Sequence, residues 1–284
     1  MKDKLLISVI VTTYNRPDAL ALVLEGLLDQ ADRRFEIIVA DDGSTGETRK
    51  VVASFQQQRR PDGPRLLHAW HADTGFRLSA VRNLGVHAAK GAYLIFLDGD
   101  CVPQTNFVSR HRELAEPGYL VSGSRVLLSQ RLSTRFLAGA APAVHRKNLG
   151  YWLAQRLSGN INKFLPLLSF GDSTMRHYSE VKWQRIKGCN LGMWRSDYAR
   201  VNGCDETFVG WGHEDADLVL CLARTGVRRK GGAFATEVFH LWHRENARTT
   251  ESENRKRVEE RMKTGLVEAP RGLREHPQPD EVIA

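Results

Sequence analysis

Two short apolar runs decide the fold class: residues 5–11 read LLISVIV, and residues 35–40 read FEIIVA. Both are rich in β-branched residues, which favour strands. Between them, the leucines of residues 18–28 recur at helical spacing. A strand, a helix and a second strand in this order predict a βαβ unit, the building block of a parallel sheet.

The same alternation continues to residue 97. We expect a strand over 65–69, a helix over 79–89 that ends before Gly91, and a strand over 93–97. The chain is therefore predicted to be an α/β protein with a Rossmann-like, mostly parallel central sheet and helices on both faces. Ligands of such sheets bind beyond the carboxyl ends of the strands. Polar residues occupy those positions at 12–15 (TTYN), 41–44 (DDGS) and 98–100 (DGD).

The pattern changes after residue 128. Residues 129–185 are rich in leucine and aromatic residues with Arg and Lys interspersed, which predicts a basic, amphipathic helical insertion. Regular structure is expected to resume at Ile186, with a helix over 214–224 and a strand over 233–239. A charged surface helix and a frayed tail are expected beyond Glu251. The predicted segments are 1–128, 129–185, 186–250 and 251–284.

The composition is that of an ordinary soluble protein, with 284 residues of which 42% are hydrophobic and 26% charged. No apolar run approaches the roughly 18 residues that a membrane span requires. Residues 1–4 are charged and lead directly into a strand, so no signal peptide is recognised and the cytoplasm is the expected compartment. The four cysteines lack metal-site spacing and are expected to be reduced and mostly buried.

The positive charge is concentrated in one part of the chain. Residues 131–187 carry ten Lys or Arg and two acids, a sum of +8 that equals the net charge of the whole sequence. Such a segment suits anionic lipid headgroups or an acidic acceptor, although a solvated face without a partner is the plainer alternative. No motif for nucleic-acid binding is recognised, so no nucleic-acid partner is expected.

The triplet Asp98-Gly99-Asp100 follows a predicted buried strand. Alternate side chains of an extended segment share a face, so both carboxylates point into one site. They repel each other unless a cation lies close by. Mn²⁺ or Mg²⁺ would supply this charge and bridge the protein to a diphosphate. The triplet alone is a weak signal, because it also occurs in surface turns.

Several motifs in succession are more specific. The stretches ISVIVTTYNRP (7–17), IIVADDGST (37–45) and RNLGVHAAKGAYLIFLDGDC (82–101) resemble the nucleotide-sugar half of family 2 glycosyltransferases with the GT-A fold. Residues 188–218, GCNLGMWRSDYARVNGCDETFVGWGHEDADL, resemble the acceptor-side half of β-1,4-galactosyltransferases and bacterial chondroitin-type polymerases. The resemblance implies that 1–128 binds the nucleotide sugar and that 186–250 binds the acceptor and carries the catalytic group.

The resemblance also implies a donor site. Thr12, Tyr14 and Asn15 would line the pocket for base and ribose. Asp42 would accept a hydrogen bond from uracil N3–H, which cytosine lacks, so a UDP-sugar is the expected donor. Asp41 and Asp42 in a plain turn before Gly43 are the alternative.

Two arginines and the acidic triplet complete the donor side of this resemblance. Arg82 would hold the base or the diphosphate, with Arg77 as its companion, because a guanidinium can donate two hydrogen bonds to a phosphate. Asp98 would meet the ribose hydroxyls and Asp100 would ligate the metal ion.

A histidine often completes such a metal site. His240 and His243 are both candidates. We prefer His240, which lies directly at the end of a strand, although His243 fits the galactosyltransferase-like register better. One of the two is expected to be a packing residue.

On the acceptor side the resemblance makes Asp215 the catalytic base and Glu214 a ligand of an acceptor hydroxyl or of the sugar. Trp211, followed by Gly212, would stack on a sugar ring. The plainer interpretation of Glu214 and Asp215 is first-turn charge at a helix N-terminus. His213 departs from the galactosyltransferase motif, which usually has glycine at that position.

One base and no enzyme nucleophile predict transfer with inversion of the anomeric carbon. The expected acceptor is a hydroxyl of a glycan or a lipid-linked saccharide, in bacterial cell-surface polysaccharide or lipopolysaccharide synthesis. The alternatives are a catalytically inactive nucleotide-sugar-binding module, which would have lost a carboxylate, and a nucleotidyltransferase. The latter would normally carry a Gly-rich, basic loop where this chain has TTYNRPD (12–18).

The aromatic residues of the basic segment support a further expectation. Tyr151, Trp152, Phe164 and Leu165 lie among basic residues, a mixture typical of an amphipathic helix at a membrane interface. Contact with the anionic inner face of the cell membrane is therefore expected. The alternatives are that the aromatics are packed core or that the segment contacts a partner subunit.

Overall fold

Four parallel strands in the order β3-β2-β1-β4 form the centre of a nine-stranded sheet in the computed structural model, which describes residues 2–140, 143–181, 183, 186–244, 248–276 and 281–283. These strands are β1 (Ile7–Thr13), β2 (Phe35–Asp41), β3 (Arg65–Trp70) and β4 (Tyr93–Asp98). Each lies within two residues of its predicted position. The predicted α/β class is confirmed.

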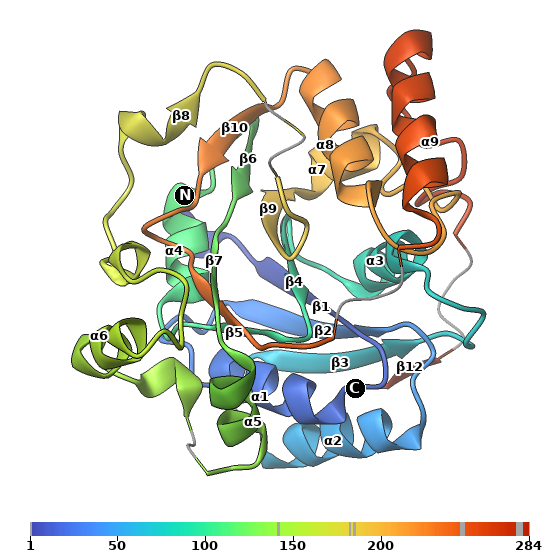
Figure 1. Cartoon of the computed structure of the whole chain (residues 1–284). Helices are drawn as coiled ribbons and strands as arrows, with labels where there is room; N and C mark the ends of the chain where they lie inside the picture. The colour runs from blue at the N-terminus through green and yellow to red at the C-terminus, as the bar shows by residue number, and fades with distance from the viewer. Residues whose placement is uncertain are drawn as a thin grey trace.

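The two faces of β1 pack against different helices. Ile7, Val9 and Val11 contribute to a core with α1 (Pro17–Leu28) and α2 (Gly46–Gln58), whereas Ile10 points to the opposite face, with α3 (Leu78–Ala88). Burial on both faces explains why β1 is mostly apolar between residues 7 and 11. Figure 1 shows the helices on both sides of the sheet, as predicted. Helix α2 escaped prediction, because just two of its residues, Thr48 and Val52, are buried.

Strands from all four predicted segments complete the sheet, whose full order is β12-β3-β2-β1-β4-β9-β6-β10-β8. The added strands are β6 (Tyr119–Ser122), β8 (His177–Tyr178), β9 (Asn190–Trp194), β10 (Arg228–Gly231) and β12 (Glu281–Ile283). Strand β9 runs antiparallel between β4 and β6 and so joins the donor-side and acceptor-side halves. The segments therefore share one hydrogen-bonded sheet.

A second, three-stranded sheet has the order β5-β11-β7. It consists of β5 (Cys101–Pro103), β7 (Arg125–Leu127) and β11 (Val238–His240). The prediction of a strand over 233–239 is wrong for residues 233–237, because Phe234 adopts a left-handed conformation (φ 61°) and the amide of Thr236 donates to the carbonyl of Gly232 in a turn. The remaining α-helices are α4 (Phe107–Leu114), α5 (Gln130–Leu137), α6 (Leu149–Leu157), α7 (Arg195–Arg200), α8 (Glu214–Arg224) and α9 (Glu251–Thr264).

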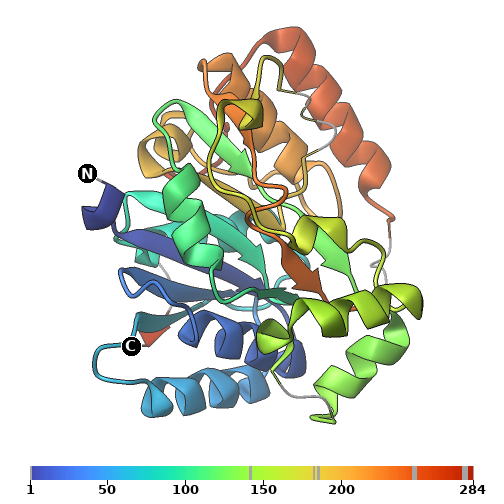
Figure 2. The same ribbon diagram turned by 90° about the vertical axis from the view of Figure 1, so that its left-hand side faces the viewer.

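The basic segment is helical, as predicted, and Figure 2 shows its helices α5 and α6 close to one another. Trp152 on α6 is buried and stacks on Phe239 with ring centroids 4.1 Å apart. Tyr151 and Phe164 are half-buried against the same core, and only Leu165 is exposed. The expectation that these aromatics face a membrane is therefore wrong for Trp152, and packing in the core is the better description.

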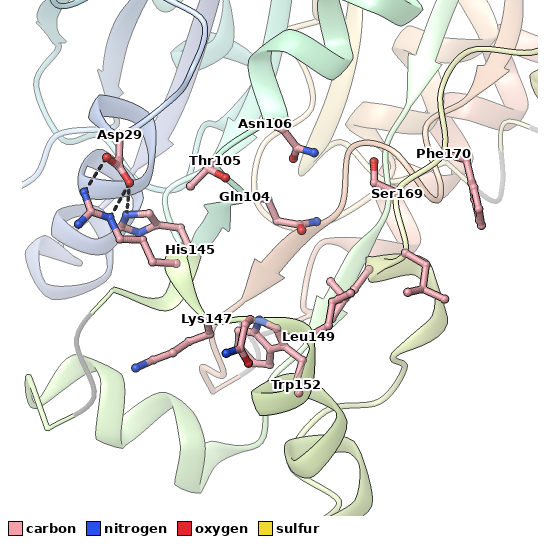
Figure 3. Close-up of a pocket in the computed structure, with 15 residues that line it drawn as sticks. Asp29, Gln104, Thr105, Asn106, His145, Lys147, Leu149, Trp152, Ser169 and Phe170 are labelled. Carbon is pink, nitrogen blue, oxygen red and sulfur yellow. Dashed lines mark hydrogen bonds and ion pairs between the residues drawn. The ribbon is translucent and has the colours of Figure 1, made fainter.

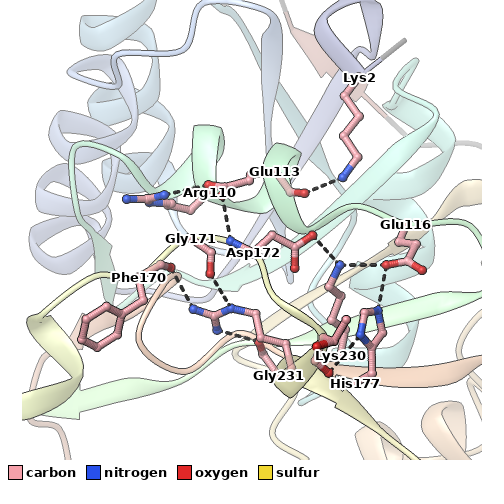
Figure 4. A network of polar contacts seen from close by, with 12 residues as sticks. Lys2, Arg110, Glu113, Glu116, Phe170, Gly171, Asp172, His177, Lys230 and Gly231 are labelled. Carbon is pink, nitrogen blue, oxygen red and sulfur yellow. Dashed lines mark hydrogen bonds and ion pairs between the residues drawn. The ribbon is translucent and has the colours of Figure 1, made fainter.

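Part of the segment's charge is used internally, and Figure 4 shows one such contact, between its Asp172 and Lys230. Arg176 is buried and donates hydrogen bonds to backbone carbonyls, including those of Gly171 and Gly231. Asp172 pairs with the buried Lys230 of β10 at 2.7 Å. Arg146 pairs with Asp29 at 2.7 Å. The exposed bases are Arg131, Arg135, Arg146, Arg156 and Lys187, and of these Arg146 has the ion pair just described; Lys182 and Arg185 lie outside the described residues.

The C-terminal region is more ordered than expected. Arg261 of α9 forms a buried pair with Asp205 and Asp217. Beyond the helix, the amide of Ala269 donates to the carbonyl of Val201, and β12 pairs with β3. The prediction of a frayed tail is therefore wrong for the described residues after α9.

Two expectations about the whole chain can be compared with the structure. All four cysteines are free and buried, as predicted. Among the helices described, none combines the length and the apolar character needed to cross a membrane.

Candidate active site

The acidic triplet lies where β4 ends, beside the end of β1. The Thr12 hydroxyl donates to Asp98 Oδ1 at 3.3 Å, and the Gly99 amide donates to the Thr12 carbonyl at 2.8 Å. A Cβ atom at position 99 would lie 2.7 Å from that carbonyl oxygen, so only glycine fits between the two acids. Thr12 therefore supports Asp98 directly, whereas its predicted contact with the base or ribose stays a prediction.

Asp100, His240 and His243 form a cluster whose ligand atoms all lie within 4.8 Å of one another. Asp100 Oδ1 is 3.7 Å from His240 Nε2, and Asp100 Oδ2 is 3.2 Å from His243 Nε2. The pairing of β11 with β5 places His240 opposite Cys101 and so beside Asp100. The structure brings both histidines to the carboxylate and does not leave one of them as a packing residue elsewhere.

The electrostatics of this cluster suit a cation. Burial raises the pKa of Asp98 and of Asp100, and the neighbouring charge of Asp100 adds to the rise at Asp98. Burial lowers the pKa of His240 to about 4, helped by the positive charge of Arg125. His240 is therefore neutral at pH 7, the form in which imidazole ligates a metal ion.

The second pair of acids opens helix α8. The Gly188 amide donates to Asp215 Oδ2 at 2.9 Å, which fixes the carboxylate at the edge of the site. Burial raises the pKa of Glu214 to about 7, and the charge of Asp215 adds to the rise. His213, just before the helix, has a left-handed backbone (φ 71°), the conformation that glycine adopts without strain.

Arg82 lies between the two acidic pairs. Its guanidinium is buried, 3.4 Å from Glu214 Oε1 and 4.0 Å from Asp98 Oδ1. A Cβ atom at Gly188 would approach its Nη2 to 2.4 Å, so the glycine makes room for this arginine. Arg82 thus connects the donor-side and acceptor-side acids, and its predicted contact with the base or diphosphate stays a prediction.

The loops after β1 and β2 are tied to each other. Asn15 accepts from the Thr45 amide at 2.9 Å and adopts a left-handed backbone (φ 48°). Asp42 accepts from His71 Nε2 and from the Arg77 amide, both at 2.8 Å. These contacts hold Asp42 rigidly at the end of the sheet.

Two other residues of the predicted donor side are more open. Tyr14 is exposed and donates through its hydroxyl to Asp73 Oδ2 at 2.9 Å. The guanidinium of Arg77 donates to the Ala72 carbonyl at 3.2 Å. Both belong to the loops next to Asp42.

Trp211 and Gly212 belong to the loop that leads into α8. The guanidinium of Arg248 lies over the Trp211 ring, 4.6 Å from its centroid. Gly212 has a φ of 101°, which favours glycine. The loop therefore places Trp211 three residues before Glu214. The stacking of Trp211 on a sugar ring stays a prediction.

Three residues of the site escaped the sequence analysis. Arg125 lies beside the histidine cluster. The Gly188 amide donates to Asp215, and His71 donates to Asp42. Gly188 and His71 had a signal: the former begins the conspicuous acceptor-side stretch at 188, and the latter follows a predicted strand. Arg125 is identifiable only from the pairing of β7 with β11.

A hollow of about 1290 Å³ lies apart from these acids, at the far end of β5 and along the basic segment (Figure 3). Its lining includes Gln104, Asn106, Lys147 and Leu149, and none of the predicted site residues.

The chain is similar to known glycosyltransferases. The family model described as "Glycosyl transferase family 2" matches residues 8–178, and the one described as "N-terminal domain of galactosyltransferase" matches residues 173–244. Chondroitin synthase of Escherichia coli is 27% identical over 230 residues, covering 78% of this chain and 32% of that protein. Validoxylamine A glucosyltransferase of Streptomyces hygroscopicus subsp. limoneus is 30% identical over 247 residues, covering 78% of this chain and 49% of that protein. The chain thus spans about a third and about half of the length of these two relatives.

Solved structures show the same fold. A mannosyltransferase from Pyrobaculum calidifontis, in complex with GDP-Man and Mn²⁺, matches with a TM-score of 0.55 and 18% identity over 84% of this chain and 58% of that chain. Residues 1–349 of TarS from S. aureus match with a TM-score of 0.54 and 14% identity over 93% of this chain and 66% of that chain. The fold is GT-A, as the sequence predicted. Because the first family model covers more than half of the sequence, the chain belongs to glycosyl transferase family 2.

Proposed function

We propose that this glycosyltransferase moves a sugar from a UDP-sugar to a hydroxyl of a glycan or lipid-linked acceptor, with a divalent metal ion and with inversion. The observation that carries the proposal is the bridging of Asp98 to Glu214 by Arg82. This bridge places the acids expected to hold the donor next to those expected to act on the acceptor.

Asp100, His240 and His243 would hold the metal ion. One carboxylate and two imidazoles form a donor set that suits Mn²⁺ better than Mg²⁺, which prefers oxygen ligands alone. When bound, the ion would neutralise charge that develops on the departing diphosphate.

Asp215 is proposed to take the proton from the acceptor hydroxyl, because the Gly188 amide holds its carboxylate at the edge of the site. Glu214, with its pKa raised to about 7, would donate or accept a hydrogen bond at a second hydroxyl. We propose no enzyme nucleophile, so the acceptor attacks from the face opposite the leaving group and the configuration inverts.

Asp42 is proposed to select uracil. Each of its oxygens accepts one hydrogen bond within the protein, and a carboxylate oxygen can accept a second. A ring N–H of uracil would find this capacity available, whereas cytosine offers no donor at that position. Tyr14 and Asn15, in the adjoining loop, would border the base and the ribose.

A role in bacterial cell-surface polysaccharide or lipopolysaccharide synthesis, at the cytoplasmic face of the membrane, is proposed from the names of the relatives and from the surface of α6. Leu149, Leu153 and Leu157 recur every fourth residue and are 45%, 45% and 81% exposed. They form one apolar stripe, with the exposed Arg156 beside it. This stripe replaces the aromatics as the proposed membrane contact.

Vesicle co-sedimentation tests the membrane contact. Replacing Leu153 and Leu157 by serine should abolish binding to anionic vesicles at low salt, while serine at the exposed Leu266, beyond α9, should not. Binding that survives the double substitution, or no binding by the wild type, contradicts this part of the proposal.

Release of free UDP from a panel of UDP-sugars with added Mn²⁺ tests the main proposal. A catalytically inactive nucleotide-sugar-binding module would bind UDP without releasing it from the donor, and a nucleotidyltransferase would instead release pyrophosphate from a nucleoside triphosphate. NMR of the transferred product should show an inverted anomeric configuration. Retention, or no turnover of any UDP-sugar, would overturn the proposal.

A further inference from the structure

Arg125 lies next to the candidate active site. Strand β7 pairs in parallel with β11, and Arg125 lies opposite Val238, two residues before His240. Residues two apart on a strand share a face, so Arg125 is on the same face as His240. Its Nη1 lies 3.7 Å from Cys189 Sγ, and the Cys189 carbonyl accepts a hydrogen bond from the Asp98 amide.

Lys163 brings a second positive charge to the same place from the basic segment. Its ammonium group donates to the hydroxyl of Ser124, the neighbour of Arg125. Burial lowers the pKa of Lys163, and the positive charge of Arg125 contributes to the lowering. Both side chains are partly exposed, so a ligand can reach them.

Neither cation has an ion-pair partner among the described residues. Glu237, whose negative charge partly opposes the lowering of the Lys163 pKa, accepts a hydrogen bond from the Phe234 amide at 2.8 Å and none from Lys163. Other cations around the fold are paired: Arg82 with Glu214, and Arg146 with Asp29. Asp98 acts on Arg125 and Glu237 acts on Lys163 only through space, without a hydrogen-bonded ion pair, so an anion between the two cations would relieve the repulsion that remains.

The backbone of Arg125 is offset along the sheet from that of His240. Arg125 pairs with Val238, and His240 lies two residues further along β11, which corresponds to about 7 Å at the usual rise per strand residue. The diphosphate of the donor is expected at the cluster itself. The unpaired cations therefore suit an additional anionic group.

We propose that Arg125 and Lys163 form a subsite for a carboxylate or phosphate carried by a substrate, in addition to the donor diphosphate. The inference rests on the proposed function, because it assumes that a nucleotide sugar occupies the adjoining site. The anionic group belongs either to the transferred sugar, as in a uronic acid, or to the acceptor. A guanidinium and an ammonium side by side recognise both chemistries.

Binding measurements on matched ligands test the subsite and separate the two sources. In the donor arm, calorimetry with Mn²⁺ compares UDP-glucose with UDP-glucuronic acid and UDP-galactose with UDP-galacturonic acid; each pair differs only at the C6 carboxylate. In the acceptor arm, glucose is compared with glucose 6-phosphate and with glucuronic acid in the presence of Mn²⁺ and UDP.

The wild type should bind the acidic member of at least one pair about tenfold more tightly, the usual effect of a hydrogen bond to a charged group. Arg125→Gln and Lys163→Met should each reduce this ratio towards one. Arg156→Gln, which removes an exposed charge elsewhere in the basic segment, should leave it unchanged. Of the two substitutions, Lys163→Met is less expected to disturb folding, because it removes a side chain that is farther from the centre of the fold.

Three results would overturn the subsite: no charge preference in either arm, a preference that survives both substitutions, or a loss of affinity for UDP itself that equals the loss for the acidic ligand. The third result would assign the cations to the diphosphate. A wild type that fails to bind UDP would instead overturn the proposed function, so the two failures are distinguishable.

Discussion

Replacing Asp100 by alanine should separate metal binding from folding. Asp100 is the single carboxylate in the cluster with His240 and His243, so Asp100→Ala leaves two imidazoles and loses the ligand that lies between them. Mn²⁺ at 100 times its dissociation constant should stabilise the wild type by about 2.7 kcal/mol. For a chain of this length, that corresponds to a rise in Tm of roughly 4 to 5 °C.

The metal-free protein should behave differently. Burial raises the pKa of Asp100, so the folded chain holds this proton more tightly than the unfolded chain. Above the pKa of the unfolded state, the ionised carboxylate therefore destabilises the fold, and its removal relieves that cost. We expect Asp100→Ala to have an unchanged or higher Tm in EDTA, no shift with Mn²⁺, and donor hydrolysis lower by several orders of magnitude.

Thermal unfolding with Mn²⁺ or EDTA, together with donor hydrolysis, checks these outcomes. Asp62→Ala, which removes an exposed acid in a turn, is the control and should retain the shift and the activity. A full Mn²⁺ shift in Asp100→Ala, or full wild-type activity in excess EDTA, would refute the assignment of the metal site.

Three further outcomes are expected. His240→Ala should weaken the Mn²⁺ dependence of activity more than His243→Ala, and equal or reversed effects would overturn that preference. Asp215→Asn should bind UDP and Mn²⁺ normally yet lose transfer by about 10²-fold or more, since an amide cannot take the proton; wild-type turnover would contradict the role of base. Burial raises the pKa of Glu237 from 4.5 to about 7, so the free energy of unfolding should fall as the pH rises through this window, and Glu237→Gln should reduce that slope in denaturant titrations. An unchanged slope would mean that Glu237 is not the group responsible.

The local patterns of the sequence were enough to predict the central strands and helices. The βαβ run over 5–40 and the strand over 93–97 are visible because strands buried on both faces of a parallel sheet are mostly apolar. Helix α8 and its first-turn acids were also placed correctly, at Glu214–Arg224. Both features depend on neighbours in the sequence, so the sequence alone identifies them.

Such local patterns could not predict contacts between segments that are distant in the sequence. Trp152 among basic residues has the composition of a membrane-facing helix, but its stacking on Phe239, 87 positions later, buries it. The turn at Phe234 and the pairing of β12 with β3 likewise have no local signature. In each case burial depends on which distant segment packs against the residue, and composition does not specify that segment.

The sequence by itself determined the family, the α/β sheet and the acids at its carboxyl edge, because these follow from periodicity and from motifs within one segment. Only the tertiary structure decided what surrounds those acids. It placed both His240 and His243 against Asp100, inserted Arg82 between Asp98 and Glu214, and brought Lys163 to Arg125. Electrostatic interactions depend on distance in space, and residues of different segments come within that distance only when the sheets assemble.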